Sequence, residues 1–126
     1  MFKIDQIDHV ALTVQDVDRS IRWYQEVLGL ERRYQEHWEI PAFLCAGTTC
    51  LALFPTDTKE PKRPPDKNTI SMRHLAFRVD RGNFEKAQDE LRRRGIEIRF
   101  EDHEISHSIY FFDPDGHELE ITTYEL

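Results

Sequence analysis

Two stretches of the chain begin alike, His9-Val-Ala-Leu-Thr-Val14 and His74-Leu-Ala-Phe-Arg-Val79. Each predicts a β-strand, in which successive side chains point to opposite faces. In each, the histidine shares its face with the alanine two residues later. The opposite face carries apolar side chains that predict a core: Val10, Leu12 and Val14 in the first stretch, and Leu75, Phe77 and Val79 in the second. The sequence therefore places an imidazole on a non-core face twice, each time beside a small residue that leaves room.

A third predicted strand, near the C-terminus, adds a carboxylate in the same way. Leu119 and Ile121 point to one face of this strand, whereas Glu118, Glu120 and Thr122 point to the other. Two histidines and one carboxylate are the side chains from which an open site for a divalent metal is built. The sequence thus supplies the ingredients of such a site.

The first half of the chain predicts the element order βαβββ. A strand over 4–14 precedes Asp16, which is a good helix N-cap, and the following helix has one apolar stripe and stops at Gly29. The half is completed by three strands, of which the last two form a hairpin around a glycine: 30–38, 42–46 and 49–54.

The second half repeats this order after a polar, proline-rich segment over 55–71, which we interpret as a linker. Its predicted elements are a strand, a helix, the start of a second strand, and a hairpin turned by Asp113-Pro-Asp-Gly116: 73–79, 83–94, 96–100, 108–112 and 118–123. His9 and His74 are 65 residues apart, and Gly29 and Gly95 are 66 apart, so the chain contains an internal duplication.

The predicted fold class is therefore α+β, built from two paired βαβββ modules. A length of 126 residues fits one domain over 1–126, with module one over 4–54, the linker over 55–71 and module two over 72–124.

The composition argues against several kinds of partner. A net charge of −7 gives no electrostatic footprint for nucleic acid or for an anionic membrane. No run approaches the roughly 20 apolar residues that span a bilayer, and the N-terminus lacks the apolar core of a signal peptide, which favours the cytoplasm. Cys45 and Cys50 could face each other across a hairpin, but in a reducing compartment we expect two reduced, buried thiols.

The chain resembles the vicinal oxygen chelate superfamily, which includes glyoxalases, bleomycin-resistance proteins and extradiol dioxygenases. The resemblance rests on three stretches: Asp8-His-Val-Ala-Leu-Thr-Val14, Met72-Arg-His-Leu-Ala-Phe-Arg-Val79 and the segment from Ser108 to Glu120. It implies paired modules whose sheets curl around a metal-binding cleft, and a divalent metal held by His9, His74 and Glu120. It also implies a homodimer and a small-molecule substrate that binds the metal through two adjacent oxygens.

The ligand set restricts the metal only to a group of ions. Neutral imidazoles and a carboxylate suit Fe²⁺, Mn²⁺, Zn²⁺, Ni²⁺ or Co²⁺. Glyoxalase I has a fourth ligand, a glutamate at the position that corresponds to Ala52 here. This difference argues against the four-ligand chemistry of glyoxalase I and of the epimerases, and favours three-ligand chemistry. Fosfomycin-type thiol transferases use three ligands and have a similar final segment, but they carry basic residues after the glutamate that are absent after Glu120 here.

Three residues are candidates for proton transfer. Extradiol dioxygenases carry a tyrosine ten residues before the glutamate, and Tyr110 stands at that distance from Glu120. His103 and His107 lie upstream of this tyrosine, and histidine is the side chain that most often transfers protons in enzymes, although neither has the spacing usual in those dioxygenases. Glu118 is interpreted as a solvated rim acid. His37 and Trp38 could line the pocket, but packing is the simpler interpretation.

Two classes of function follow. The first is a metalloenzyme of this superfamily, either a glyoxalase-like lyase or isomerase or an extradiol-type dioxygenase, with a fosfomycin-type thiol transferase as an alternative. The second is a metal-free binding module of the bleomycin-resistance type. Such modules generally lack the ligand set, whereas this chain keeps His9, His74 and Glu120, so we favour the enzyme.

Overall fold

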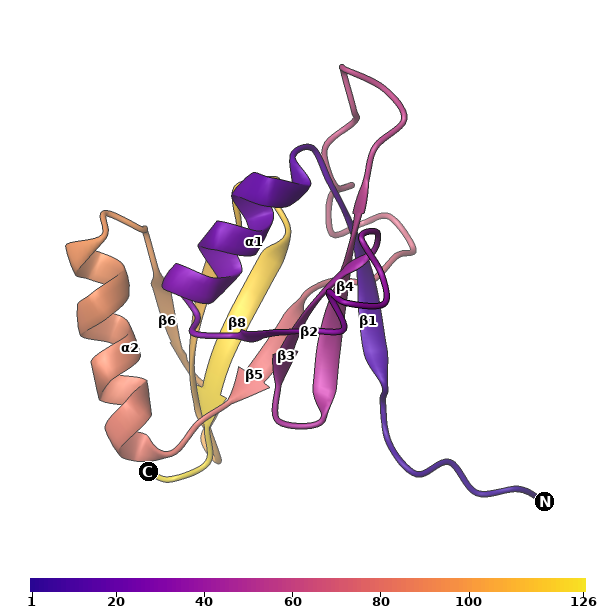
Figure 1. Ribbon diagram of the computed structural model, residues 1–126. Helices are drawn as coiled ribbons and strands as arrows, with labels where there is room; N and C mark the ends of the chain where they lie inside the picture. Colours follow the sequence, from indigo (N-terminus) through magenta and orange to yellow (C-terminus); the bar gives the residue numbers. More distant parts are fainter. The chain divides into compact units, whose positions relative to one another are not determined.

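The structure, a computed structural model, describes every residue from Met1 to Leu126. The chain divides into two compact units, unit 1 over Met1–Lys62 and unit 2 over Arg63–Leu126 (Figure 1). The division falls inside the 55–71 segment that the sequence analysis interprets as a linker. None of the helices is long and apolar enough to cross a membrane.

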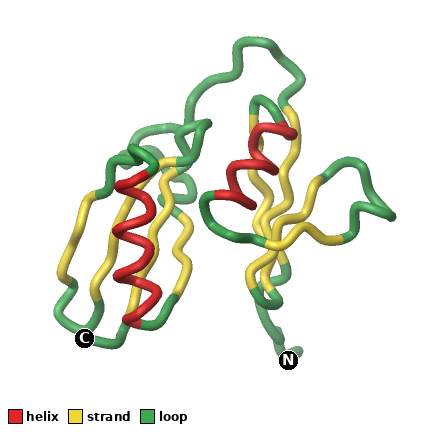
Figure 2. The backbone as a smooth tube through the Cα atoms, turned by 60° about the vertical axis from the view of Figure 1, so that its left-hand side comes forward, coloured by secondary structure: helices red, strands yellow, loops and turns green.

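Unit 1 is a four-stranded mixed sheet with one helix. Its elements are β1 (His9–Val14), α1 (Val17–Glu26), β2 (Glu31–Arg33), β3 (Ala42–Ala46) and β4 (Thr49–Pro55). The strand order is β1-β4-β3-β2, in which β1 runs parallel to β4 and the other neighbours are antiparallel. Helix α1 packs against β2, β3 and β4, so one face of the sheet is covered by the helix (Figure 2).

Unit 2 repeats the same arrangement. Its elements are β5 (Leu75–Arg78), α2 (Arg81–Arg93), β6 (Arg99–Asp102), β7 (His107–Phe112) and β8 (Glu118–Thr123). The strand order is β5-β8-β7-β6, again with a parallel first pair and antiparallel neighbours. The predicted α+β class and the two βαβββ modules are confirmed.

The helices begin and end for local reasons. The carboxylates of Asp16 and Asp80 cap α1 and α2 by accepting hydrogen bonds from the backbone N–H groups of Arg19 and Asn83. Past the end of α1, Gly29 has a φ of 66°, a left-handed conformation that glycine adopts without a Cβ clash.

The core of each unit lies between its helix and its sheet. In unit 1 the fully buried Tyr24 of α1 lies on this side with Leu44 and Leu53 of the sheet. In unit 2, Phe84 and Leu91 of α2 are buried together with Ile109 of β7 and Leu119 of β8. Along their strands, Ile109 and Leu119 alternate with the residues of the opposite sheet face.

The strand registers show that the two units are equivalent residue by residue. Ala11 lies opposite Ala52 in unit 1, as Ala76 lies opposite Glu120 in unit 2. Phe43 lies opposite Ala52, and Tyr110 lies opposite Glu120. Unit 1 therefore carries Ala52 and Phe43 at the positions where unit 2 carries Glu120 and Tyr110.

Some predicted boundaries are wrong in unit 1. The first strand begins at His9 rather than at residue 4, because β4, its only neighbour, begins to pair with it there. The predicted strand over 30–38 ends at Arg33, because Tyr34 has a φ of 65° and its carbonyl accepts hydrogen bonds from the N–H groups of His37 and Trp38. This turn replaces the second half of the predicted strand.

Boundaries also shift in unit 2. The strand predicted over 73–79 covers only Leu75–Arg78, so His74 directly precedes it. The helix begins at Arg81, two residues before its predicted start, because Asp80 is the N-cap. The strand predicted from 96 begins at Arg99, where pairing with β7 starts.

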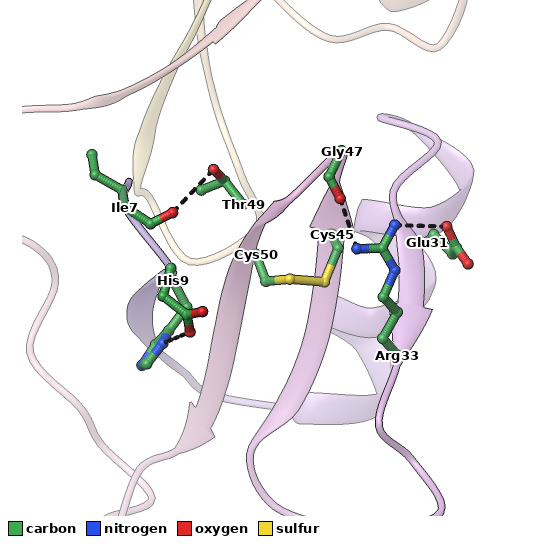
Figure 3. Close-up of a disulfide and its surroundings, with 9 residues drawn as sticks. Ile7, His9, Glu31, Arg33, Cys45, Gly47, Thr49 and Cys50 are labelled. Carbon is green, nitrogen blue, oxygen red and sulfur yellow. Dashed lines mark hydrogen bonds and ion pairs between the residues drawn. A yellow bond between two sulfur atoms is a disulfide. The ribbon is translucent and has the colours of Figure 1, made fainter. Parts of the chain in front are cut away.

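The expectation of two reduced cysteines is wrong. Cys45 and Cys50 lie directly opposite each other on β3 and β4, with a Cα–Cα distance of 4.0 Å, and form a disulfide (Figure 3). Both cysteines are buried. The register of the hairpin, not the compartment, decides this pairing.

We expect Phe84→Ala to lower the free energy of unfolding by about 3–5 kcal/mol, because a fully buried ring leaves a cavity that the core of unit 2 does not refill. Met72→Ala is the control, since this side chain is exposed and its loss should cost less than about 0.5 kcal/mol. Urea denaturation followed by circular dichroism measures both. Equal midpoints for the two variants would contradict the assignment of the core.

Candidate metal centre and proton-transfer pair

His74 and Glu120 meet on the open face of unit 2. Glu120 lies in the middle of β8, and His74 lies two residues before Ala76, its neighbour across the parallel pair. Nε2 of His74 is 2.8 Å from Oε1 of Glu120. The small side chain of Ala76 leaves the room in which the two functional groups come together.

The second oxygen of Glu120 is also held. The hydroxyl of Ser108 donates a hydrogen bond of 2.6 Å to Oε2 of Glu120, and Ser108 Oγ lies 2.9 Å from Oγ1 of Thr122. The side chain of Glu120 is only 10% exposed. Because a buried carboxylate is costly without partners, these contacts fix its position.

Glu118 lies on the other side of His74. Its Oε1 is 3.7 Å from Nδ1 of His74, and its side chain is only 9% exposed. The interpretation of Glu118 as a solvated rim acid is therefore wrong. A carboxylate near Nδ1 leaves Nε2 as the nitrogen that faces Glu120, which is the arrangement that orients a metal-ligating histidine.

His9 has the same kind of partner in unit 1. Its Nδ1 is 2.8 Å from Oδ2 of Asp8. Its ring lies 5.3 Å from the ring of Phe43. Nε2 of His9 is again the nitrogen that the carboxylate leaves open. Each histidine thus lies two residues before the equivalent alanine, Ala11 or Ala76, and has a carboxylate near its Nδ1.

The donor set of unit 2 fits a divalent metal. Two ligands at about 2.1 Å from one metal and at right angles to each other stand about 3 Å apart, close to the observed separation of His74 and Glu120. Imidazole nitrogen and carboxylate oxygen are ligands that suit the ions named above. The structure brings together no group of three or more His, Cys, Asp or Glu side chains that could hold a metal ion. Ala52, at the position equivalent to Glu120, offers no donor.

Tyr110 and His103 form a pair beside this carboxylate. The hydroxyl of Tyr110 is 3.0 Å from Nε2 of His103, and its ring meets the ring of His74 edge-on at 5.5 Å. The guanidinium carbon of Arg99 lies 4.7 Å from the centre of the Tyr110 ring. Glu101 Oε2 lies 3.6 Å from Nε2 of His103. The tyrosine therefore stands between the two candidate ligands of unit 2 and a histidine.

Burial raises the pKa of Tyr110 above its ordinary value of 10.0, and the negative charges of Glu120 and Glu101 raise it further. The side chain is consequently a neutral phenol near neutral pH. A phenol of this kind donates a hydrogen bond to an oxygen rather than carrying a negative charge into the site.

His107 lies on the opposite face from Tyr110. It is an odd number of residues from Tyr110 on β7, so it points to the helix side. There its Nδ1 is 2.8 Å from Nη2 of Arg81, the first residue of α2. Of the three predicted proton-transfer residues, the structure brings together Tyr110 and His103 and does not bring His107 to them.

Sequence similarity decides the family. The sequence profile of the glyoxalase/bleomycin resistance protein/dioxygenase superfamily matches residues 6–121. The chain belongs to this superfamily. The resemblance stated from the three sequence stretches is therefore confirmed.

Members of the superfamily that are similar to this chain include two transferases. The chain is 30% identical to a glutathione transferase FosA of Serratia marcescens, a match that covers 94% of this chain and 80% of the relative. It is 31% identical to a metallothiol transferase FosB of Staphylococcus saprophyticus, with 98% of this chain and 80% of the relative covered. We conclude that the chain is an enzyme of the superfamily.

A solved structure gives the same fold. A glyoxalase/dioxygenase from Nostoc punctiforme superposes with a TM-score of 0.81 at 26% identity, and the match covers 96% of this chain and 92% of the other. The superfamily therefore accounts for the whole length over which the two βαβββ units extend.

Sequence reasoning missed the residues that support the site in this superfamily member. Ser108 shares a strand face with Tyr110, so alternation would have placed it beside Glu120. Asp8 directly precedes β1, and no periodic signal in the sequence marks it as a partner of His9. Arg99 lies within the predicted strand over 96–100, but the sequence does not indicate its contact with the ring of Tyr110.

In the metal-free enzyme, we expect Tyr110 to ionise above the ordinary tyrosine pKa of 10.0, and Glu120→Gln to lower the pKa of Tyr110 because it removes a negative charge. The ultraviolet absorbance of tyrosinate measures this, with Tyr110→Phe as the subtracted control. A Tyr110 pKa that does not change in Glu120→Gln would contradict the proximity of the two side chains.

The same raised pKa predicts how stability changes in alkali. Between the unfolded and folded pKa values the folded state keeps a proton that the unfolded chain has lost. The contribution of Tyr110 to the free energy of unfolding is therefore full below pH 10.0 and is lost as the pH rises through the folded-state pKa. We expect Tyr110→Phe to flatten this alkaline loss in urea denaturation at increasing pH. An equally steep loss in both proteins would contradict it.

Proposed function

We propose that this enzyme is a divalent-metal-dependent transferase that joins a thiol to a small molecule carrying two adjacent oxygens. Its metal ligands are His9, His74 and Glu120. The observation that carries the proposal is the contact of His74 with Glu120 on the open face of unit 2, with both groups oriented by further polar partners. The names of the two curated relatives, a glutathione transferase and a metallothiol transferase, favour thiol transfer over lyase or dioxygenase chemistry.

The residues have separate tasks in this proposal. A bound divalent ion of the group Fe²⁺, Mn²⁺, Zn²⁺, Ni²⁺ or Co²⁺ supplies positive charge that stabilises the negative charge developing on the substrate oxygens. Ser108 and Asp8 hold Glu120 and His9 in position. Tyr110, a neutral phenol, donates a hydrogen bond to a substrate oxygen, and its contact with His103 Nε2 allows a proton to be held at either atom.

The bond changes of the proposed step balance without an oxidant. The sulfur of the thiol forms a bond to a carbon of the substrate, and the bond from that carbon to oxygen breaks. The proton of the thiol ends on the released oxygen, with the Tyr110–His103 pair as the group that carries it. We further propose that the enzyme acts as a homodimer in the cytoplasm, with no nucleic-acid or membrane partner.

A ring-opening dioxygenase is the second candidate. The observation that favours it is the Tyr110–His103 contact, because it pairs a tyrosine with a histidine beside the candidate ligands despite the unusual sequence spacing. The metal content of protein purified anaerobically without a metal column separates the two candidates. Stoichiometric iron together with oxygen uptake on catechols would favour the dioxygenase.

We expect His9→Ala, His74→Ala and Glu120→Ala each to abolish stoichiometric metal binding while the fold is retained, because each removes a proposed ligand. Isothermal titration with Mn²⁺ or Zn²⁺ measures binding, and circular dichroism checks the fold. His107→Ala is the matched control, since this histidine lies on the opposite face of β7. Unchanged affinity in any of the three ligand variants would refute that ligand.

Ser108→Ala tests the support of the carboxylate. Loss of the hydroxyl that donates to Glu120 should weaken metal binding by about 10- to 100-fold, because partners of this kind orient the ligands they contact. Ser106→Ala, which alters another buried serine beside the same strand, is the control. An equal effect of both variants would mean that Ser108 acts only through stability.

Activity is tested with glutathione and fosfomycin as the first substrate pair, in the presence of each divalent ion, by mass spectrometry of the adduct. We expect Tyr110→Phe to lower kcat by about 100-fold as the proton-carrying hydroxyl is removed. Adduct formation that does not depend on metal would contradict the proposal.

A further inference from the structure

Three aromatic side chains of unit 1 form a continuous surface beside His9. Ring-centre distances are 5.6 Å between Tyr34 and Trp38, 5.5 Å between Tyr34 and Phe43, and 5.3 Å between Trp38 and Phe43. The ring of His9 lies 5.3 Å from that of Phe43. We call Tyr34, Trp38 and Phe43 the aromatic wall.

The outer rings of the wall are exposed although they are large and apolar. Tyr34 is 48% exposed and Trp38 is 46% exposed, whereas Phe43 beneath them is buried. On the same strand face, next to Phe43, are the buried Cys45–Cys50 disulfide and Ala52. This part of unit 1 is therefore an apolar floor with two exposed aromatic rings above it.

The backbone is strained where it presents these rings. Tyr34 has a φ of 65°, which is unfavourable for a bulky residue. The turn is held by two hydrogen bonds, from the N–H groups of His37 and Trp38 to the carbonyl of Tyr34. Strain of this kind persists where the surroundings fix it, and it gathers at ligand-binding sites.

The polar group nearest in register does not compete for this surface. Arg33 lies opposite Phe43, but its guanidinium donates to the carbonyl of Gly47 and to the carboxylate of Glu31 (Figure 3). Its charge is thereby engaged away from the rings. The wall offers π-faces and apolar contact rather than a charge.

We propose that the aromatic wall binds a planar ring of the substrate, so that the small molecule carries an aryl group as well as the two adjacent oxygens. The inference rests on the proposed function in that His9, which contacts the wall, is a proposed metal ligand. Stacked or edge-on aromatic pairs gain about 0.5–1.5 kcal/mol beyond area burial, which corresponds to about a two- to tenfold preference for a ring.

The first test needs no metal. Metal-free protein is titrated with benzyl alcohol, and with ethanol as the ring-free probe, while the indole N–H signals of the two tryptophans, Trp23 and Trp38, are followed by NMR. We expect benzyl alcohol to shift the signal of Trp38 and not that of Trp23. Trp23 lies on α1, so its signal serves as the internal control. Absence of a selective shift at Trp38 would overturn the inference.

The second test measures selectivity in the metal-loaded protein. Phenylphosphonate and methylphosphonate share the oxygens that bind a metal and differ by the ring. We expect phenylphosphonate to bind about fivefold more tightly by titration calorimetry, and Trp38→Leu or Tyr34→Leu to remove that preference. Trp38→Phe keeps a ring and should retain most of it. Phe2→Leu, an exposed aromatic outside the wall, should leave it unchanged.

The outcomes separate the wall from the proposed function. Equal binding of both phosphonates would contradict the proposed role of the aromatic wall but would not contradict the proposed metal site. If neither phosphonate binds, the proposed metal chemistry is contradicted. The benzyl alcohol titration then decides by itself whether the aromatic wall binds a ring. A preference that persists in Trp38→Leu and Tyr34→Leu would place the ring elsewhere and overturn the inference.

Discussion

A carboxylate kept from water is the constraint on which the candidate site depends. Glu120 has a side chain only 10% exposed, and an anion in that position is stable only with partners. The position of β8 between β5 and β7 supplies them, because it brings His74 and Ser108 to the two carboxylate oxygens. A shift of one residue in this register would turn Glu120 into the core beneath α2 and leave it there without them.

Strand alternation was sufficient to predict which side chains share the open faces. It places the side chains of four residues on the open faces: His9, Ala11, Glu120 and Tyr110. It would also place His107 on the helix face if the strand were predicted to begin at residue 107 instead of 108. Alternation does not predict the conformation of the loops that connect the strands. His103 reaches Tyr110 from a turn after β6, a contact that spacing along the chain does not predict.

The remaining errors come from tertiary context. The residues up to Trp38 have a composition that suits a strand, but Tyr34 adopts a left-handed conformation and the chain turns there. Because this position is not a glycine, the sequence does not indicate the turn. The hairpin register brings Cys45 and Cys50 opposite each other, and this proximity overrides an expectation based on compartment. The first error therefore comes from a local backbone turn, and the second from the pairing of two strands.

The matching registers of the two units also bear on which substitutions affect the carboxylate. At the two positions where unit 2 has Glu120 and Tyr110, unit 1 has Ala52 and Phe43 on the same backbone framework. Because the duplicated units share this framework, unit 1 presents an apolar surface at the positions where unit 2 presents an acid and a phenol. A substitution of Ala52 or Phe43 would therefore reshape the apolar surface of unit 1 without replacing Ser108 or His74, the residues that contact the carboxylate of Glu120.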